Sequence, residues 1–168
     1  LNRARAGTLM GSKIISKSLV GKKVVVFAVD ATGDNALGIV SECGALKVSL
    51  PGCSTMSIPI LELLSTVFIL KEYGHLLAGV TLYIACDAQG ATYWVNKGKA
   101  QADAPNDLLR LLRAAEEYYG VMIIQRWLTR WYNYKADRVA ALPIAQAQAL
   151  LKLEHVGEIT PAGRPDQF

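Results

Sequence analysis

The stretch KVVVFAVDATGDNALGIV, from Lys23 to Val40, carries the pattern that decides the fold. Its first part is a continuous apolar, β-branched run that ends at Asp30, and such runs are typical of strands covered on both faces. A turn-forming sequence, Thr-Gly-Asp-Asn, follows at residues 32–35 and precedes a second apolar run. The pattern therefore predicts two antiparallel strands joined by a short turn, with Asp30 near the end of the first.

Apolar runs and turn signals predict the elements of the rest of the chain. Further strands are expected at residues 36–41, 46–50, 80–86 and 121–124. Helices are expected at residues 59–70, 88–95, 105–119 and 133–153, the last interrupted near Pro143. Three strands in a row, followed by alternating helices and strands, indicate an α/β fold. We expect a five-stranded mixed sheet, with three antiparallel strands and then parallel strands, flanked by helices.

The composition indicates one folded domain with flanking segments. Of the 168 residues, 52% are hydrophobic and 19% are charged, so the chain can bury a core and is not disordered. We expect the folded domain over residues 22–153, a basic N-terminal arm or linker over residues 1–21, and a C-terminal tail over residues 154–168. No uninterrupted apolar run reaches the roughly 18 residues of a membrane span, so no membrane span is predicted.

Positive charge is concentrated near the start of the chain. Six basic residues and no acid precede Asp30, which fits either a soluble, flexible tail or an arm that contacts phosphates. The net charge of +4 favours a polyanionic partner. Because the chain does not begin with Met, we expect it to be part of a longer polypeptide.

Cysteine and histidine are too few for a Cys/His metal site. Cys43, Cys53 and Cys86 have no zinc-site spacing, and the only histidines are His75 and His155. We interpret the cysteines as reduced thiols of an intracellular protein, cytoplasmic or nuclear.

Two acids follow predicted core strands. One apolar run ends at Asp30 and another, residues 80–86, ends at Asp87. If the two strands are parallel neighbours, both carboxylates emerge at the same edge of the sheet, where ligand sites are favoured. The alternative is that each Asp is an ordinary turn residue after a strand.

Two further acids lie on predicted helices. Glu62 is the only charged residue between Ile58 and Leu70. Either it reaches solvent at the rim of the helix, or a metal ion compensates its charge, because an unpaired buried carboxylate is costly. Asp137 falls in the first turns of the last helix, where the helix dipole favours an acid with or without a function.

Together the four acids would form an oxygen-rich cluster without Cys or His. Such a cluster suits Mg²⁺ or Mn²⁺. Two ions about 4 Å apart would activate a water and stabilise the leaving oxygen of a phosphodiester. Without cations the carboxylates repel one another, so metal binding and folding of this edge should be coupled.

The same acids stand in local sequences that resemble the ribonuclease H family, most closely the domains of retroelement and pararetrovirus reverse transcriptases. The similar segments are DATGDNALGIV (30–40), LELL (61–64), IACDAQGATYWVNKG (84–98) and NYKAD (133–137), within residues 22–142. The resemblance implies a ribonuclease H-like fold and hydrolysis of the RNA strand of RNA/DNA hybrids with two Mg²⁺ ions, for which Mn²⁺ can substitute. It implies that Asp30, Glu62, Asp87 and Asp137 are the metal ligands, and that a reverse transcriptase polymerase domain is a partner in the same polypeptide or complex.

The sequence departs from that family at three places. No His lies between Ile124 and Asp137, where many members have one in a mobile loop, and Ala88 stands where Ser or Asn is common. The basic helical protrusion of cellular members is not evident, although Lys97 and Lys99 could be its remnant. These departures predict weak hybrid affinity for the isolated domain.

The basic, aromatic stretch QRWLTRWYNYK, residues 125–135, is the expected substrate contact. We expect Arg126 and Arg130 to be exposed near the substrate, together with Lys97 and Lys99. Asn133 either hydrogen-bonds the backbone near the site or caps the last helix. Trp127 and Trp131 are expected to be core residues, the alternative being aromatic faces that pack on sugars or bases.

Two other functions compete with the nuclease. One is a degenerate ribonuclease H-like module that binds nucleic acid or scaffolds an assembly, although such modules usually lose one or more carboxylates. The other is an integrase or transposase core, which the NYKAD ending argues against.

Overall fold

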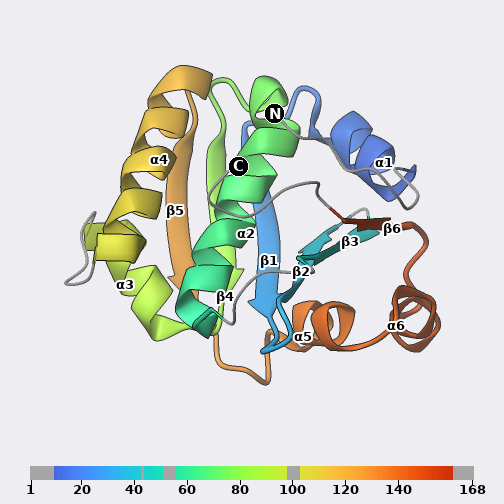
Figure 1. Cartoon of the computed structure of the whole chain (residues 1–168). Helices are drawn as coiled ribbons and strands as arrows, with labels where there is room; N and C mark the ends of the chain where they lie inside the picture. The colour runs from blue at the N-terminus through green and yellow to red at the C-terminus, as the bar shows by residue number, and fades with distance from the viewer. Residues whose placement is uncertain (1–9, 43, 51–55, 98–102, 161–168) are drawn as a thin grey trace.

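The computed structural model describes residues 10–42, 44–50, 56–97 and 103–160 (Figure 1). Its strands are β1 (Val24–Ala31), β2 (Ala36–Ser41), β3 (Gly44–Ser49), β4 (Thr81–Cys86), β5 (Met122–Trp127) and β6 (Val156–Ile159). Its helices are α1 (Met10–Leu19), α2 (Ile58–Tyr73), the 3-10 turn η1 (Gly74–Leu76), α3 (Gln89–Lys97), α4 (Asp103–Tyr119), α5 (Tyr134–Ala141) and α6 (Ile144–Leu151).

The strands form one mixed sheet in the order β5-β4-β1-β2-β3-β6. β1, β2 and β3 form an antiparallel meander, and β4 and β5 extend it in parallel beside β1. The expected α/β fold is therefore confirmed. Because β1 and β4 are parallel neighbours, their carboxyl ends meet at the same edge of the sheet.

The expected number of strands was wrong, because the described residues form six. β6 has only four residues, and its place depends on pairing with β3, a long-range partner that a local pattern does not reveal. β6 lies within the segment expected as a tail. Likewise, α1 lies within the expected arm, where Ile15 and Leu19 are buried and the helix contacts β3 and β6.

Helices cover both faces of the sheet. α2 crosses one face of the sheet with α3 and α4 beside it, and every residue from 61 to 70 is buried (Figure 1). This explains why the helix is apolar all round rather than on one side. α5 contacts the opposite face through β1, β2 and β3. No described helix is both long and apolar enough to cross a membrane.

Gly38 in β2 sets how closely α5 approaches the sheet. A Cβ atom at this position would lie 2.2 Å from the backbone oxygen of Ala136 and 2.7 Å from the backbone nitrogen of Ala140. Only glycine leaves room for that contact. The start of α5, and Asp137 with it, is thereby held close to β2 and the end of β1.

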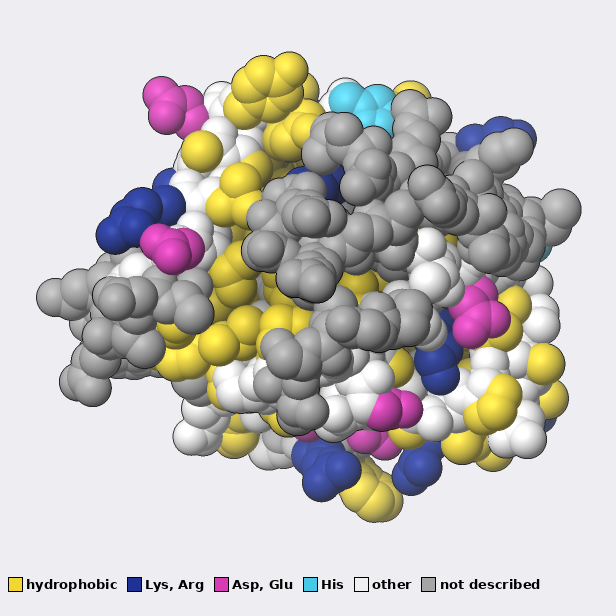
Figure 2. All heavy atoms as spheres, in the orientation of Figure 1, with side chains coloured by type: hydrophobic (Ala, Val, Ile, Leu, Met, Phe, Trp, Pro, Cys, Tyr) yellow, Lys and Arg dark blue, Asp and Glu magenta, His cyan; other side chains and the backbone are white. Residues whose placement is uncertain are grey.

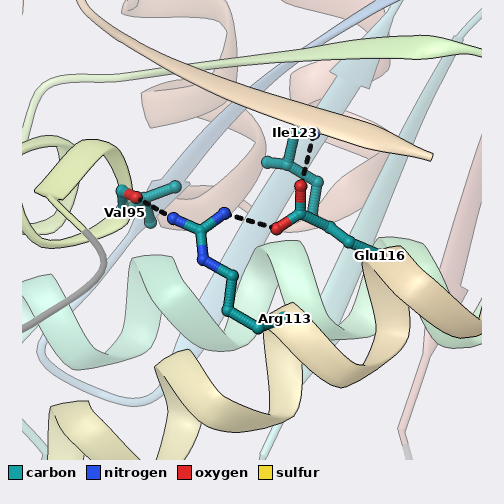
Figure 3. Close-up of polar contacts among 4 residues, drawn as sticks. All are labelled: Val95, Arg113, Glu116 and Ile123. Atoms are coloured by element: carbon teal, nitrogen blue, oxygen red, sulfur yellow. Dashed lines mark hydrogen bonds and ion pairs between the residues drawn. The ribbon is translucent and has the colours of Figure 1, made fainter.

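A polar network joins α4 to α3 and β5 (Figure 3). Arg113 of α4 donates to the backbone oxygen of Val95 in α3 over 2.6 Å and pairs with Glu116 over 2.5 Å. The second oxygen of Glu116 accepts from the backbone nitrogen of Ile123 in β5 over 3.0 Å. These contacts stabilise the position of α3, the helix that follows Asp87.

Candidate metal centre

Three of the predicted acids meet at one edge of the sheet. Asp30 lies near the end of β1, Asp87 directly follows β4, and Glu62 lies in the first turns of α2. Each offers a carboxylate oxygen, and these oxygens all lie within 4.8 Å of one another. The parallel pairing of β1 with β4 brings the two aspartates together, and the packing of α2 on the sheet adds the glutamate.

Glu62 is completely buried, with 0% of its surface exposed, so the alternative of a solvent-exposed rim position was wrong. Its Oε2 accepts a hydrogen bond from the backbone nitrogen of Ala88 over 3.2 Å, whereas its Oε1 is buried without a hydrogen-bond partner. Burial, followed by a hydrogen bond to Asp87 and the charge of Asp87, raises the pKa of Glu62 to about 9.

Asp30 is also buried, and its ionised form is likewise disfavoured. Burial and then the charge of Asp87 raise the pKa of Asp30 to about 7. Among the described residues, no lysine or arginine forms an ion pair with Asp30, Glu62 or Asp87. The cluster therefore contains negative charge and an unpartnered buried oxygen that the surrounding side chains do not compensate.

These features fit a divalent metal ion. Hard oxygen ligands without Cys or His are what Mg²⁺ and Mn²⁺ prefer. A cation would neutralise the mutual repulsion of the carboxylates and give the buried Oε1 of Glu62 a partner. Asp30, Glu62 and Asp87 are the residues that could hold it.

Asp137 lies beside this group from the other face of the sheet. It lies close enough to Asp30 to contribute to the raised pKa of that residue, and it lines the same hollow of about 790 Å³ as Asp30 and Asp87. Arg130 and Arg138 each approach its carboxylate to 3.8 Å. Asp137 thus adjoins the three-acid group through Asp30 and has cations of its own nearby.

Asn133 connects α5 to β1 next to the cluster. Its Nδ2 donates to the backbone oxygen of Val29 over 2.8 Å, and its side chain makes no capping hydrogen bond to α5. Asn133 occupies the N-cap position of α5, but of the two expected contacts its side chain makes the hydrogen bond to a backbone near the site and not the capping one. Because Val29 precedes Asp30, this hydrogen bond positions the start of α5 relative to the cluster.

A second layer of polar contacts supports the acids and was not predicted. Gln125 is buried in β5, and its Nε2 donates to the sulfur of Cys86 over 3.1 Å. Thr92 lies 3.3 Å from the same sulfur. Burial, and then the charge of Glu62, raises the pKa of Cys86 to about 12. Gln125 directly follows the strand predicted at residues 121–124, and the local sequence did not single it out.

The two tryptophans are not core residues, contrary to expectation. Trp127 is 44% exposed and Trp131 is 82% exposed. β5 extends further than predicted, to Trp127, so this side chain stands at the rim and donates from Nε1 to the backbone oxygen of Asp87. Trp131 lies in the turn that leads to α5, outside the packed layers.

The residues expected to contact the substrate differ in where they lie relative to the hollow over the acids. Arg130 lines the hollow over the acids. Arg126 is exposed on β5 and lies over the ring of Tyr83, 5.9 Å from its centre, and is not among the residues that line that hollow. Lys97 is the last residue of α3, where only its backbone is described, and Lys99 lies outside the described residues.

Comparison with solved structures identifies the architecture. LC11-RNase H1, isolated from compost by a metagenomic approach, is 13% identical with a TM-score of 0.52, and the match covers 75% of this chain and 99% of that one. RNase H1 from the halophilic archaeon Halobacterium salinarum is 14% identical with a TM-score of 0.51, covering 77% and 98%. This chain has the ribonuclease H fold.

A weaker match is the N-terminal RNase H domain of Rv2228c from Mycobacterium tuberculosis, solved as a fusion with maltose binding protein. It is 18% identical with a TM-score of 0.48, covering 70% of this chain and 95% of that one. No family model and no curated protein matches the sequence.

Proposed function

We propose that this chain is an endonuclease that hydrolyses the RNA strand of RNA/DNA hybrids with two divalent metal ions. The observation that carries the proposal is the group formed by Asp30, Glu62 and Asp87, whose carboxylate oxygens lie within 4.8 Å of one another. Two of the three are buried without a compensating cation, which is a costly arrangement unless metal ions bind. The ribonuclease H fold is consistent with this chemistry, although a fold alone does not assign a function.

In this proposal Asp30, Glu62, Asp87 and Asp137 hold the ions, with Mg²⁺ as the natural metal and Mn²⁺ as a substitute. Bound there, the ions would activate a water and stabilise the leaving oxygen. The water oxygen forms a bond to phosphorus and the bond from phosphorus to the 3′ oxygen breaks, which leaves a 3′-hydroxyl and a 5′-phosphate. Gln125 and Cys86 act behind the acids, because they keep the end of β4 and the buried face of Glu62 in position.

The proposed substrate contacts surround the hollow. Arg130 is exposed beside Asp137 and can neutralise a phosphate of the hybrid. Arg126, Lys97 and Lys99 would contact phosphates further from the cut. Asn133 is buried, so we propose that it acts through the position of β1 and α5.

We also propose that the domain acts beside a reverse transcriptase polymerase domain, in one polypeptide or complex. This part rests on the resemblance of segments such as NYKAD at residues 133–137 to retroelement enzymes. Its test is a cleavage assay of the domain alone and of the same domain joined to its native neighbours. The joined form should cut hybrids at lower enzyme concentration.

The deciding experiment is cleavage of a hybrid labelled on its RNA strand, with Mg²⁺ or Mn²⁺, by the wild type and by Asp87→Asn. We expect the variant to lose about 1,000-fold or more of the rate, because a metal site contributes several kcal/mol to the transition state. The matched control is Asp107→Asn, which changes an exposed aspartate on α4 that pairs with Arg110. That variant should cut like the wild type.

Three results would count against the proposal. If neither metal gives cutting above the Asp87→Asn background, even with the native neighbouring domains attached, the protein is not this nuclease. Hybrid binding without cutting would support the degenerate binding module instead. Nicking or joining of duplex DNA would support the integrase class.

A further inference from the structure

The turn between β5 and α5 and the start of α5 carry an exposed surface of aromatic rings and guanidinium groups. We call it the aromatic platform and define it by Arg130, Trp131, Tyr132, Tyr134 and Arg138. Trp131 is 82% exposed and Tyr132 is 74% exposed, and Tyr134 is half exposed. Figure 2 shows hydrophobic and Lys or Arg side chains projecting together at the lower edge of the molecule, beside acidic side chains.

The platform surrounds a hollow of about 900 Å³ that adjoins the candidate metal centre. Arg130, Asp137 and Ala141 line both this hollow and the one over the acids. A strand that occupies the metal centre can therefore continue over α5 onto the platform without leaving the surface.

The chemistry of the platform fits one class of ligand. Aromatic faces stack on nucleobases, and guanidinium groups neutralise the phosphates between them. In a paired hybrid the base faces are hidden in the stack, so only unpaired nucleotides can use these rings. A single exposed aromatic residue is common on protein surfaces. Three exposed aromatic residues close together, with two arginines, at the entrance to a proposed nuclease site indicate a binding surface.

We propose that the aromatic platform binds a single-stranded segment of nucleic acid that continues from the hybrid held at the metal centre. The inference rests on the proposed function for its location, and adds a substrate class: hybrids with unpaired extensions. Each stacked base is expected to contribute about 1–3 kcal/mol, so one or two stacked bases tighten binding about tenfold or more.

The test measures binding by fluorescence anisotropy with the full chain in EDTA, so that no strand is cut. The reference probe is a short blunt hybrid. The other probes are the same hybrid with an unpaired RNA extension, an unpaired DNA extension or a fully paired extension. Each extension is tested at both ends of the hybrid. We expect an unpaired extension on one side to tighten binding about tenfold, and a paired extension of equal length to add much less.

Substitutions in the aromatic platform test which side chains cause the tighter binding of extended hybrids. Trp131→Ala and Tyr132→Ala should remove most of the gain from the extension, and Trp131→Phe should keep most of it because a stacking face remains. The matched control is Tyr118→Ala on α4, which removes an aromatic side chain that is also 82% exposed but lies outside the platform. It should leave the gain unchanged.

The outcomes separate this inference from the proposed nuclease. If blunt and extended hybrids bind equally, or if no extended hybrid binds, or if Trp131→Ala leaves the gain intact, the platform is not a single-strand site whatever the cleavage assay shows. If the gain depends on Trp131 but no hybrid is cut with metal, the platform stands and the nuclease fails. Equal gains from RNA and DNA extensions support stacking chemistry common to both, and a gain from RNA alone narrows the ligand to RNA.

Discussion

Oε1 of Glu62 is buried without a hydrogen-bond partner, and the Glu62 carboxylate lies within 4.8 Å of the carboxylates of Asp30 and Asp87. Without metal, the protein can reduce the cost of this arrangement only by keeping protons on the acids. This is why the pKa values of Glu62 and Asp30 are raised, to about 9 and about 7.

The raised pKa values predict how stability depends on pH in EDTA. Unfolded Glu and Asp release their protons near 4.5 and 3.8, whereas folded Glu62 and Asp30 hold theirs to about 9 and about 7. The folded state therefore binds more protons in this window. The contribution of these two acids to the free energy of unfolding should be highest below the unfolded pKa values, and should fall as pH rises from about 4 to about 9.

Urea unfolding at a series of pH values in EDTA measures this slope. Glu62→Gln cannot ionise, so it should flatten the curve, most clearly above pH 7 where Asp30 has largely titrated. Glu117→Gln, on the exposed side of α4, is the control and should follow the wild type. If the wild type and Glu62→Gln have the same slope over this window, the electrostatic account of the cluster is contradicted.

At the scale of helices and strands, the position of α5 depends on the lack of a side chain at one residue of β2. It brings Asp137 to Asp30, and it can lie this close to β2 because residue 38 has no side chain. The hydrogen bond from Asn133 to Val29 holds its first turn in place.

Gly38→Ala should therefore displace α5 by steric clash. Over-packing of this kind costs about 1–3 kcal/mol in the free energy of unfolding. Cleavage should fall by more than the loss of folded protein explains, because Asp137 moves with the helix. Thermal or urea unfolding and the hybrid cleavage assay measure the two effects.

Gly33→Ala is the control for unfolding only, since a Cβ at residue 33 would meet nothing within 4 Å and its φ is not in the left-handed region, but Gly33 lines the hollow over the acids. If Gly38→Ala unfolds like Gly33→Ala and cuts like the wild type, the close approach of α5 does not set the position of Asp137.

At the scale of the whole molecule, metal binding and folding should be linked. A ligand that binds only the folded state raises the free energy of unfolding by about 2.7 kcal/mol at 100 times its dissociation constant. We expect Mg²⁺ or Mn²⁺ to raise the melting temperature in a concentration-dependent way, measured by calorimetry. Asp87→Asn should remove most of this rise and Asp107→Asn should keep it. Equal rises in both variants would place the metal effect elsewhere.

The sequence predicted the parts of the molecule that depend on local pattern. The continuous apolar run before Asp30 and the one before Asp87 were enough to predict β1 and β4 and the edge where the acids meet. Glu62 was noticeable because an apolar helix contains no other charge between residues 58 and 70.

The parts that it did not predict depend on distant partners. β6 exists because β3 offers a free edge, and α1 packs on that pair. Trp127 and Trp131 were expected inside, as anchors of the connection from strand to helix, but the position of the β5 end and of the following turn decides their exposure. The contact between Gln125 and Cys86 joins two strands and has no local signature.

The four acids lie in β1, in α2, directly after β4 and in α5, so no fragment that ends before α5 contains all of them. During synthesis on a ribosome, Asp137 would emerge long after Asp30. A growing chain would therefore lack the complete set of proposed metal ligands until α5 has been made. The order of elements along the chain thus delays the proposed activity until most of the domain has been synthesised.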